Sequence, residues 1–278
     1  MLFQRGMQME PKTIVTAFGN VAYWVSHREN APALVMLHGL TADHTLFEPQ
    51  YQALQDRYTV LVWDAPAHGQ SRPYEPFDYR TAAEHLKSML DAEGITKAVL
   101  IGQSMGGFVI QTFLASYPAY GVGFIAIDTC PFGESYYSRS DRWWLKQVEP
   151  LARWYPLRVL RWAMVRQCAC TPYGRENMRR ILARYGKAEL CHLMGVGFAG
   201  FLSVNQELTI PCPSLLIVGA KDKTGKVRAY NEAWRQKTGF PLEIIPDAAH
   251  NANTDQPERV NQLVEQFVMA LPSADTLA

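Results

Sequence analysis

The sequence predicts an α/β fold, in which a mainly parallel, twisted sheet is flanked by helices and interrupted by one inserted helical lid. Short runs of Val, Ile, Leu and Ala alternate with helical patterns along most of the 278 residues. From residue 133 to residue 208 this alternation stops and no strand pattern occurs. Regular alternation of strands and helices is typical of an open sheet with right-handed crossover connections.

Seven strands are expected, each from a short apolar run. Several runs lack the polar alternation of strands that face water on one side, which indicates strands covered by helices on both faces. The expected strands are Val21–Ser26, Ala33–Leu37, Tyr58–Trp63, Ala98–Ile101, Phe124–Ile127, Ser214–Val218 and Leu242–Ile245.

Five helices are expected between and after these strands. The last one follows Asp255, with Glu258 three residues further on and Pro257 in the first turn. This is the spacing of a capping box, so we expect Asp255 to cap that helix. The expected helices are Phe47–Gln55, Tyr79–Glu93, Met105–Tyr117, Val227–Thr238 and Gln256–Leu271.

The segment without strands divides the chain into a core of residues 1–132 and 209–278 and a helical lid (cap) of residues 133–208. The lid holds 12 of the 27 Lys and Arg residues but only 6 of the 26 Asp and Glu residues. Its arginines either attract an anionic substrate or a lipid surface, or form an ordinary solvated helix face. They are Arg139, Arg142, Arg153, Arg158, Arg161, Arg166, Arg175, Arg179, Arg180 and Arg184.

The lid is also rich in aromatic residues. They either line a pocket for an apolar acyl or aromatic group, or bury the lid helices against each other and the core. We expect packing to account for more than half of them. The residues in question are Trp143, Trp144, Trp154, Trp162, Tyr136, Tyr137, Phe198 and Phe201.

Composition excludes several classes of protein. Apolar residues make up 48% of the chain and charged residues 19%, so a large core is expected and disorder is not. The net charge of +1 provides no global field that would attract nucleic acid. The five cysteines are an odd number, which favours free thiols in a reducing compartment, and Cys168 and Cys170 have no second pair at metal-site spacing.

The sequence carries no signal for export or membrane insertion. Met1–Glu10 lacks the sustained apolar segment of a signal peptide, and about 18 uninterrupted apolar residues occur nowhere. We therefore expect a cytoplasmic protein without stable membrane insertion. The sequence does not indicate an oligomeric state.

The segment Gly102-Gln103-Ser104-Met105-Gly106 lies between a predicted strand and a predicted helix. A serine hydroxyl becomes a useful nucleophile only when it is exposed and its proton is removed. A tight turn from strand to helix exposes it, and glycines at 102 and 106 allow a strained backbone and close packing of helix against strand. The start of the helix also offers free N–H groups to an oxyanion. We therefore predict that Ser104 is a nucleophile.

At this motif the chain resembles the α/β-hydrolase family, and the resemblance covers nearly the whole chain. It implies that the oxyanion loop is His38-Gly39-Leu40, and that the N–H groups of Leu40 and Met105 form the oxyanion hole. The turn that runs from Asp64 to Ser71 matches a second loop of the family, with Ala67 where a glycine is frequent. The resemblance implies no cofactor and no metal.

The remaining catalytic residues are expected after Ser104 in the order acid, then histidine. Asp222 follows the strand that ends at Val218, and His250 follows the strand that ends at Ile245. Both therefore lie at the carboxyl edge of the sheet, where open α/β sheets assemble their sites. We predict that His250 is the base and that Asp222 orients it.

Other titratable residues are alternatives to this set. Asp128 also follows a predicted strand, and it is the rival acid, a pocket-lining residue or a supporting one. His38 and His68 are expected to support their own loops.

This constellation predicts hydrolysis of a small or medium carboxylic ester through an acyl-enzyme. Amide, lactone and thioester substrates use the same machinery. Haloalkane dehalogenases and epoxide hydrolases of this fold use an aspartate nucleophile, whereas position 104 is serine. Carbon–carbon bond hydrolases usually carry tryptophan after the histidine, where this chain has Asn251, and cofactor-free haloperoxidases have the same triad. A non-catalytic ligand sensor is the alternative from a different class.

Overall fold

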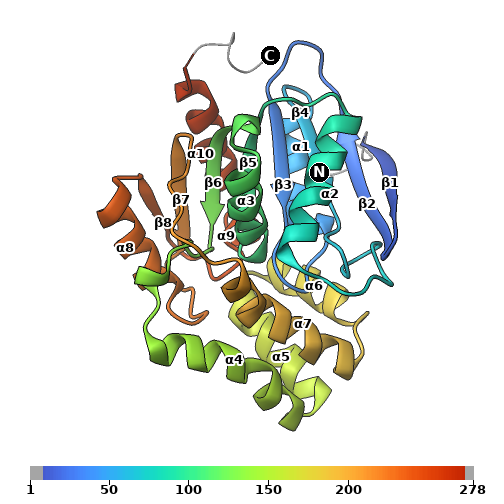
Figure 1. Cartoon of the computed structure of the whole chain (residues 1–278), viewed down its shortest axis with the longest axis vertical. Helices are drawn as coiled ribbons and strands as arrows, with labels where there is room; N and C mark the ends of the chain where they lie inside the picture. Colours follow the sequence, from blue (N-terminus) through green and yellow to red (C-terminus); the bar gives the residue numbers. More distant parts are fainter. Residues whose placement is uncertain (1–8, 273–278) are drawn as a thin grey trace.

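The computed structural model describes residues 9–272 and contains one eight-stranded sheet with helices on both faces (Figure 1). The strand order is β1-β2-β4-β3-β5-β6-β7-β8. Strands β3 to β8 are parallel, whereas β1 and β2 join the sheet in antiparallel pairs. The strands are β1 Glu10–Thr16, β2 Gly19–Ser26, β3 Ala33–Leu37, β4 Thr59–Trp63, β5 Ala98–Gln103, β6 Gly121–Ile127, β7 Ser214–Gly219 and β8 Leu242–Ile245.

All seven predicted strands are present, and the predicted fold class is confirmed. The eighth strand, β1, was not predicted from the sequence. It is an exposed edge strand that pairs only with β2, from Glu10 opposite Val25 to Thr16 opposite Gly19. Because β1 buries little apolar surface, it lacks the apolar run that identified the other strands.

Two apolar layers hold the helices against the sheet. Along β3, Leu34 and Met36 pack in the layer formed with α1 (Glu48–Leu54) and α10 (Pro257–Ala270). Val35 and Leu37 point the other way, into the layer formed with α2 (Tyr79–Ala92), α3 (Met105–Ser116) and α8 (Val227–Thr238). Helices on both faces explain why the strand sequences are continuously apolar.

The five predicted helices of the core are present to within one or two residues, and the structure adds three short helical elements that were not predicted. They are η1 His44–Phe47, α1 Glu48–Leu54, α2 Tyr79–Ala92, α3 Met105–Ser116, η2 Pro118–Tyr120, α8 Val227–Thr238, α9 Ala252–Asp255 and α10 Pro257–Ala270.

The predicted cap of the last helix is wrong. Asp255 is the last residue of the short helix α9, so the N-cap position of α10 falls on Gln256 instead. The Gln256 side chain makes no capping hydrogen bond. The Asp255 carboxylate accepts hydrogen bonds from the N–H groups of Ala249, Cys170 and Thr171 instead. Cys170 and Thr171 are 85 and 84 residues away in sequence, so the local spacing could not reveal these partners.

A helical insertion separates β6 from β7, as expected (Figure 1). Helix α4 packs against α7, and α5 against α6, around a small apolar core that includes Leu160, Ile181 and Leu190. The division at residues 133 and 208 into core and lid stays a prediction. The elements of the insertion are η3 Glu134–Tyr136, α4 Arg139–Trp154, α5 Leu157–Cys168, α6 Pro172–Leu182, α7 Lys187–Ala199 and η4 Gly200–Ser203.

The expectations about thiols and membranes can be compared with the structure in part. All five cysteines are free thiols, as expected. Within residues 9–272, no helix combines the length and the apolar character needed to cross a bilayer. Of the segment Met1–Glu10, in which no signal peptide was expected, residues 1–8 lie outside the described residues.

Candidate active site

Ser104 occupies a strained turn between β5 and α3. Its φ of 50° and ψ of −116° lie in a region that residues with side chains rarely adopt. A Cβ at Gly102 would lie 2.6 Å from the Cα of Gly107, and one at Gly106 would overlap the carbonyl oxygen of Leu37. Two glycines thus let α3 start against the sheet, and the turn presents the Ser104 hydroxyl at the wall of a cavity.

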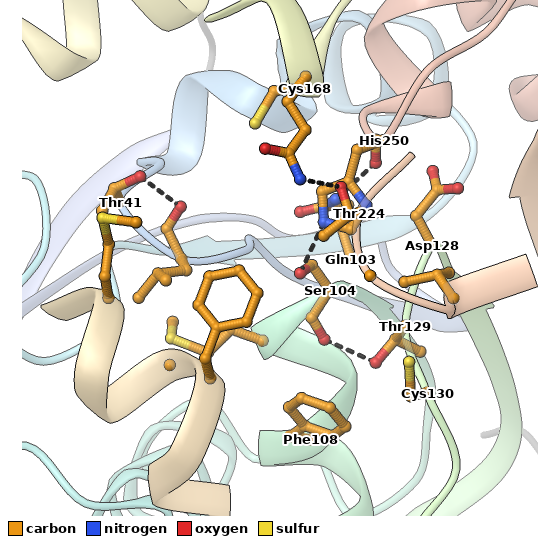
Figure 2. Close-up of a pocket in the computed structure, with 18 of the residues that line it drawn as sticks. Thr41, Gln103, Ser104, Phe108, Asp128, Thr129, Cys130, Cys168, Thr224 and His250 are labelled. Carbon is orange, nitrogen blue, oxygen red and sulfur yellow. Dashed lines mark hydrogen bonds between the residues drawn. The ribbon is translucent and has the colours of Figure 1, made fainter. Parts of the chain in front are cut away.

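The structure brings Ser104, His250 and Asp222 together. The loops after β7 and β8 carry Asp222 and His250 to the carboxyl edge of the sheet, beside the turn after β5. Oγ of Ser104 lies 2.9 Å from Nε2 of His250. Figure 2 marks this hydrogen bond with a dashed line between the two side chains. Nδ1 of His250 lies 2.9 Å from Oδ2 of Asp222. The three side chains therefore form one continuous chain of hydrogen bonds.

The charges at this site suit removal of a proton from Ser104. An ionised carboxylate only accepts hydrogen bonds, so Nδ1 of His250 carries the proton and Nε2 accepts the Ser104 hydroxyl. Burial alone would raise the pKa of Asp222, but the charge and hydrogen bond of His250 and the N–H of Thr224 lower it. Burial alone would lower the pKa of His250, but the Asp222 charge raises it above 6.5.

Asp128, the rival acid, lies behind this chain of hydrogen bonds. Its carboxylate accepts the N–H of Gly219 at 2.8 Å and the N–H of Ala252 at 3.0 Å, so it joins the ends of β6 and β7 to α9. Burial and the nearby Asp222 charge raise the pKa of Asp128 well above its usual value. Both carboxylate oxygens of Asp128 accept hydrogen bonds from backbone N–H groups, whereas the carboxylate of Asp222 accepts the hydrogen bond from His250.

The predicted oxyanion hole also faces the cavity. Leu40 and Met105 both belong to the cavity wall together with Ser104. Within the described chain, neither backbone N–H donates a hydrogen bond to another protein group. Both donors are thus available to an oxygen atom bound beside Ser104.

Two residues that the sequence analysis passed over hold the site in place. The Gln103 amide donates to the carbonyl of His250 at 2.8 Å, and the Thr129 hydroxyl donates to the carbonyl of Ser104 at 2.7 Å. Gln103 fills the variable position before the serine in the Gly-x-Ser-x-Gly pattern, so the pattern itself drew no attention to it.

The helical insertion is bonded directly to the His250 loop. The N–H of Asn251 donates to the carbonyl of Cys168 at 2.7 Å. Asp255 connects Ala249 on the loop to Cys170 and Thr171 at the junction of α5 and α6. The position of His250 therefore depends on contacts with the insertion as well as with the sheet.

His38 and His68 support their loops, as expected. His38 accepts the N–H of Ala65 at Nε2, and Nδ1 of His68 donates to the carbonyl of Pro66. Burial lowers the pKa of both side chains, to about 3 for His68. Ala67, which stands where a glycine is frequent, adopts the left-handed φ of 67°.

The cavity above Ser104 is lined mainly by apolar side chains from the sheet loops and from all four helices of the insertion. Thioether and phenyl groups dominate its wall, and Phe108 stacks on Phe201 with ring centroids 4.3 Å apart. Its apolar wall includes Leu40, Met105, Phe108, Tyr137, Leu145, Met164, Met178, Met194, Phe198, Phe201 and Val227.

The expectation that packing buries most of the lid aromatics is wrong for the four tryptophans, and for the arginines the structure narrows the alternatives. Tyr137, Phe198 and Phe201 line the cavity, but none of the four tryptophans does so, and none of the ten arginines does so. Nor are the tryptophans buried by packing, because they are between 55% and 86% exposed. Their outward position could not be predicted from the aromatic content of the segment.

Three side chains lie close enough together to contact one metal ion. Among the described residues, Asp128, Asp222 and His250 offer three potential ligand atoms within 4.8 Å of one another. These side chains are already engaged in hydrogen bonds with one another and with backbone N–H groups. The hydrogen bonds explain their proximity.

Comparisons with known proteins agree with this architecture. A model of the alpha/beta hydrolase family matches residues 34–263. A 3-oxoadipate enol-lactonase of Acinetobacter baylyi is 27% identical over 264 residues, which cover 87% of this chain and 91% of that protein. The human serine hydrolase BPHL is 24% identical, over 86% and 80% of the two chains. An esterase of Thermogutta terrifontis has a similar structure, with a TM-score of 0.76, 21% identity and coverage of 97% and 100%.

Proposed function

The chain belongs to the α/β-hydrolase family, and from this premise we propose that it hydrolyses an uncharged carboxylic ester with an apolar acyl group. The proposal rests on one observation. The hydrogen-bonded series Ser104, His250 and Asp222 ends at a mainly apolar cavity, and the wall of this cavity includes Leu40 and Met105 with their two unused backbone donors.

In the proposed reaction, Oγ of Ser104 attacks the ester carbonyl carbon while Nε2 of His250 takes the hydroxyl proton. The carbonyl oxygen becomes an oxyanion that the N–H groups of Leu40 and Met105 stabilise. When the carbon–oxygen bond breaks, His250 returns the proton to the departing alkoxide, which leaves as an alcohol. The acyl group remains on Ser104 as an ester.

Water completes the cycle. His250 takes a proton from a water molecule, and the hydroxide oxygen attacks the acyl carbon. The Ser104 oxygen then leaves, recovers its proton from His250, and the carboxylic acid is released. During both steps the negative charge of Asp222 stabilises the imidazolium form of His250.

The proposed substrate class follows from the polarity of the cavity wall. Lys226 is the only Lys or Arg residue among those that line it, and its ammonium lies 2.7 Å from the carboxylate of Asp141. A substrate carboxylate buried there would lack a free cationic partner, at a cost of several kcal/mol. Apolar acyl chains gain instead from contact with the methionine and phenylalanine side chains.

A lactone is the second candidate substrate. It is a cyclic ester, so the same steps would open it, and the similarity to an enol-lactonase favours this candidate. In a lactone the departing alkoxide stays attached to the acyl group until water releases the hydroxy acid.

The first experiment tests the nucleophile. A fluorophosphonate probe should label the wild-type chain, and Ser104→Ala should abolish labelling while circular dichroism stays unchanged. Sustained turnover of p-nitrophenyl butyrate should be lost in the same variant. Labelling that persists in Ser104→Ala would place the nucleophile elsewhere, and a burst of labelling without turnover would favour a ligand sensor.

A second experiment tests the substrate class. Initial rates are compared for p-nitrophenyl esters from acetate to decanoate, for a neutral lactone, and for an ester of a dicarboxylic acid that keeps one free carboxylate. We expect kcat/KM to rise with chain length beyond acetate, and the charged ester to be at least tenfold poorer than a neutral ester of equal length. Preference for acetate or for the charged ester would contradict the proposed substrate class.

A further inference from the structure

The outer side of α4 and α5 exposes a group of large apolar side chains. Four of the seven tryptophans lie here with exposed fractions of 55–86%, whereas Trp24, Trp63 and Trp234 are at most 4% exposed. We define the α4–α5 face by its exposed apolar residues, which are Trp143, Trp144, Leu151, Trp154, Tyr155, Val159 and Trp162.

The residues of this group on α4 form a stripe on one side of that helix, and the group continues past the corner into α5. In α4, Trp143, Leu151 and Trp154 are eight and then three residues apart, so they lie on one side of the helix. Tyr155, Val159 and Trp162 follow at spacings of four and three across the corner and along α5. Both helices lie at the bottom of the view in Figure 1, on the side of the insertion away from the sheet.

The opposite sides of these helices are already occupied. Leu145 of α4 and Met164 of α5 line the cavity, and Ala152 and Leu160 belong to the apolar core of the insertion. The exposed stripe is therefore a second apolar side, and packing within the described chain does not use it.

The α4–α5 face is also strongly basic. Residues 139–168 contain seven Lys and Arg residues but only two acidic residues, Asp141 and Glu149. Both acids are paired, with Lys226 and Arg153. Arg158 and Arg166 make no ion pair with any described residue, and the Arg166 guanidinium lies 5.0 Å from the ring centroid of Trp162.

We propose that the α4–α5 face binds peripherally to an anionic phospholipid surface. Tryptophan side chains prefer the boundary between headgroups and acyl chains, and a helix face that combines them with Lys and Arg is typical of interfacial binding. The positive charge complements phosphatidylglycerol or phosphatidylserine headgroups. A second copy of the chain fits this face less well, because two copies joined here would oppose their positive charges.

Binding to vesicles tests this proposal. The wild-type chain is mixed with vesicles of phosphatidylcholine alone or with 30% phosphatidylglycerol, and the bound fraction is measured by sedimentation. We expect binding to the anionic vesicles, a shift of tryptophan emission to shorter wavelength, and release of the protein by 0.5 M salt. Absence of binding, or equal binding to both lipids, would overturn the proposal.

Two double variants test the residues. Trp154→Ser with Trp162→Ser should weaken binding at least tenfold, and Arg158→Gln with Arg166→Gln about 25-fold, at roughly fivefold per basic residue. The matched controls are Met269→Ser, which is an exposed apolar residue on α10, and Arg80→Gln with Arg235→Gln, which remove two exposed charges from α2 and α8. These controls should bind like the wild type.

Circular dichroism and the thermal midpoint check that each variant is folded. Because the readout is vesicle binding, the test does not depend on enzyme activity. Sedimentation velocity without lipid tests the alternative partner. A wild-type dimer that the tryptophan variants convert to monomer would overturn the lipid proposal and assign the face to a second copy of the chain.

Discussion

Replacing Asp222 by Asn tests how the candidate site prepares His250. In the wild type, the Asp222 carboxylate accepts the proton on Nδ1 at 2.9 Å, which leaves Nε2 free to accept from Ser104. The amide group of the substituted side chain can instead donate to Nδ1. The imidazole proton then moves to Nε2 and points at the Ser104 hydroxyl, so the base can no longer accept a proton in the ground state.

We expect kcat to fall about 10⁴-fold, the size of the loss that the equivalent change causes in serine proteases, or about 5.4 kcal/mol of transition-state stabilisation. Asp128→Asn serves as the comparison. It keeps one acceptor for the N–H of Gly219 or Ala252 but turns an NH₂ group toward the other, so it should cost about 1–3 kcal/mol of stability. Its effect on kcat should stay below about tenfold, or 1.4 kcal/mol.

The assay is the pH dependence of kcat/KM for p-nitrophenyl butyrate, together with thermal unfolding. Only neutral His250 can act as the base, and the Asp222 charge raises its pKa above 6.5. Wild-type activity should therefore rise with pH through an apparent pKa above 6.5. In Asp222→Asn the effect of burial remains while the charge is lost, so the midpoint should move to lower pH.

Two outcomes would refute this reasoning. If Asp128→Asn lowers kcat more than Asp222→Asn does, Asp128 is the acid that matters. If Asp222→Asn lowers kcat but leaves the midpoint of the pH profile unchanged, the carboxylate does not set the charge of His250.

Two further predictions concern stability and packing. Gly106→Ala forces a Cβ against the carbonyl oxygen of Leu37, so it should cost about 1–3 kcal/mol of stability and at least tenfold in kcat. Gly186→Ala, with no heavy atom within 4 Å, should leave kcat unchanged and cost at most about 1 kcal/mol of stability, because Gly186 is the N-cap of α7. Burial lowers the pKa of His68 to about 3, whereas the same side chain has a pKa of 6.5 in the unfolded chain. As the pH drops below 6.5, the unfolded chain binds a proton that the folded chain does not bind, so the free energy of unfolding falls. This accounts for about 2 kcal/mol at pH 5. Chemical denaturation at pH 7.5 and 5 should show a smaller loss for His68→Gln, and an equal loss would contradict the assignment.

Much of the fold could be predicted from the sequence because its strands are buried on both faces. Burial removes the polar positions and leaves the apolar runs that identified the inner strands, such as β3, β4, β5 and β7. Strand β1 escaped prediction because its edge position leaves it partly exposed. The insertion was recognised by the missing strand pattern. Which side of each helix faces outward could not be predicted from a segment that is rich in Arg and Leu throughout and holds its four tryptophans between residues 143 and 162.

The candidate site divides in the same way. Ser104, Asp222 and His250 were selected because each follows a predicted strand, and parallel strands bring their carboxyl ends to one edge of the sheet. The choice between Asp222 and Asp128 was different, because both follow strands. It depended on which carboxylate the loops bring within hydrogen-bond distance of His250.

The sequence by itself determined the sheet, the order of its elements and the turn that carries Ser104, since these depend on local pattern: apolar runs and glycines beside a serine. Only the tertiary structure decided what Asp255 binds, which carboxylate meets the imidazole, and that the four tryptophans of α4 and α5 face outward. Those outcomes depend on contacts between segments that are far apart in the sequence, such as the contact between Cys170 and Asp255, which are 85 residues apart. Contacts of that kind leave no periodic pattern in the chain, because they arise only when the packed elements meet in space.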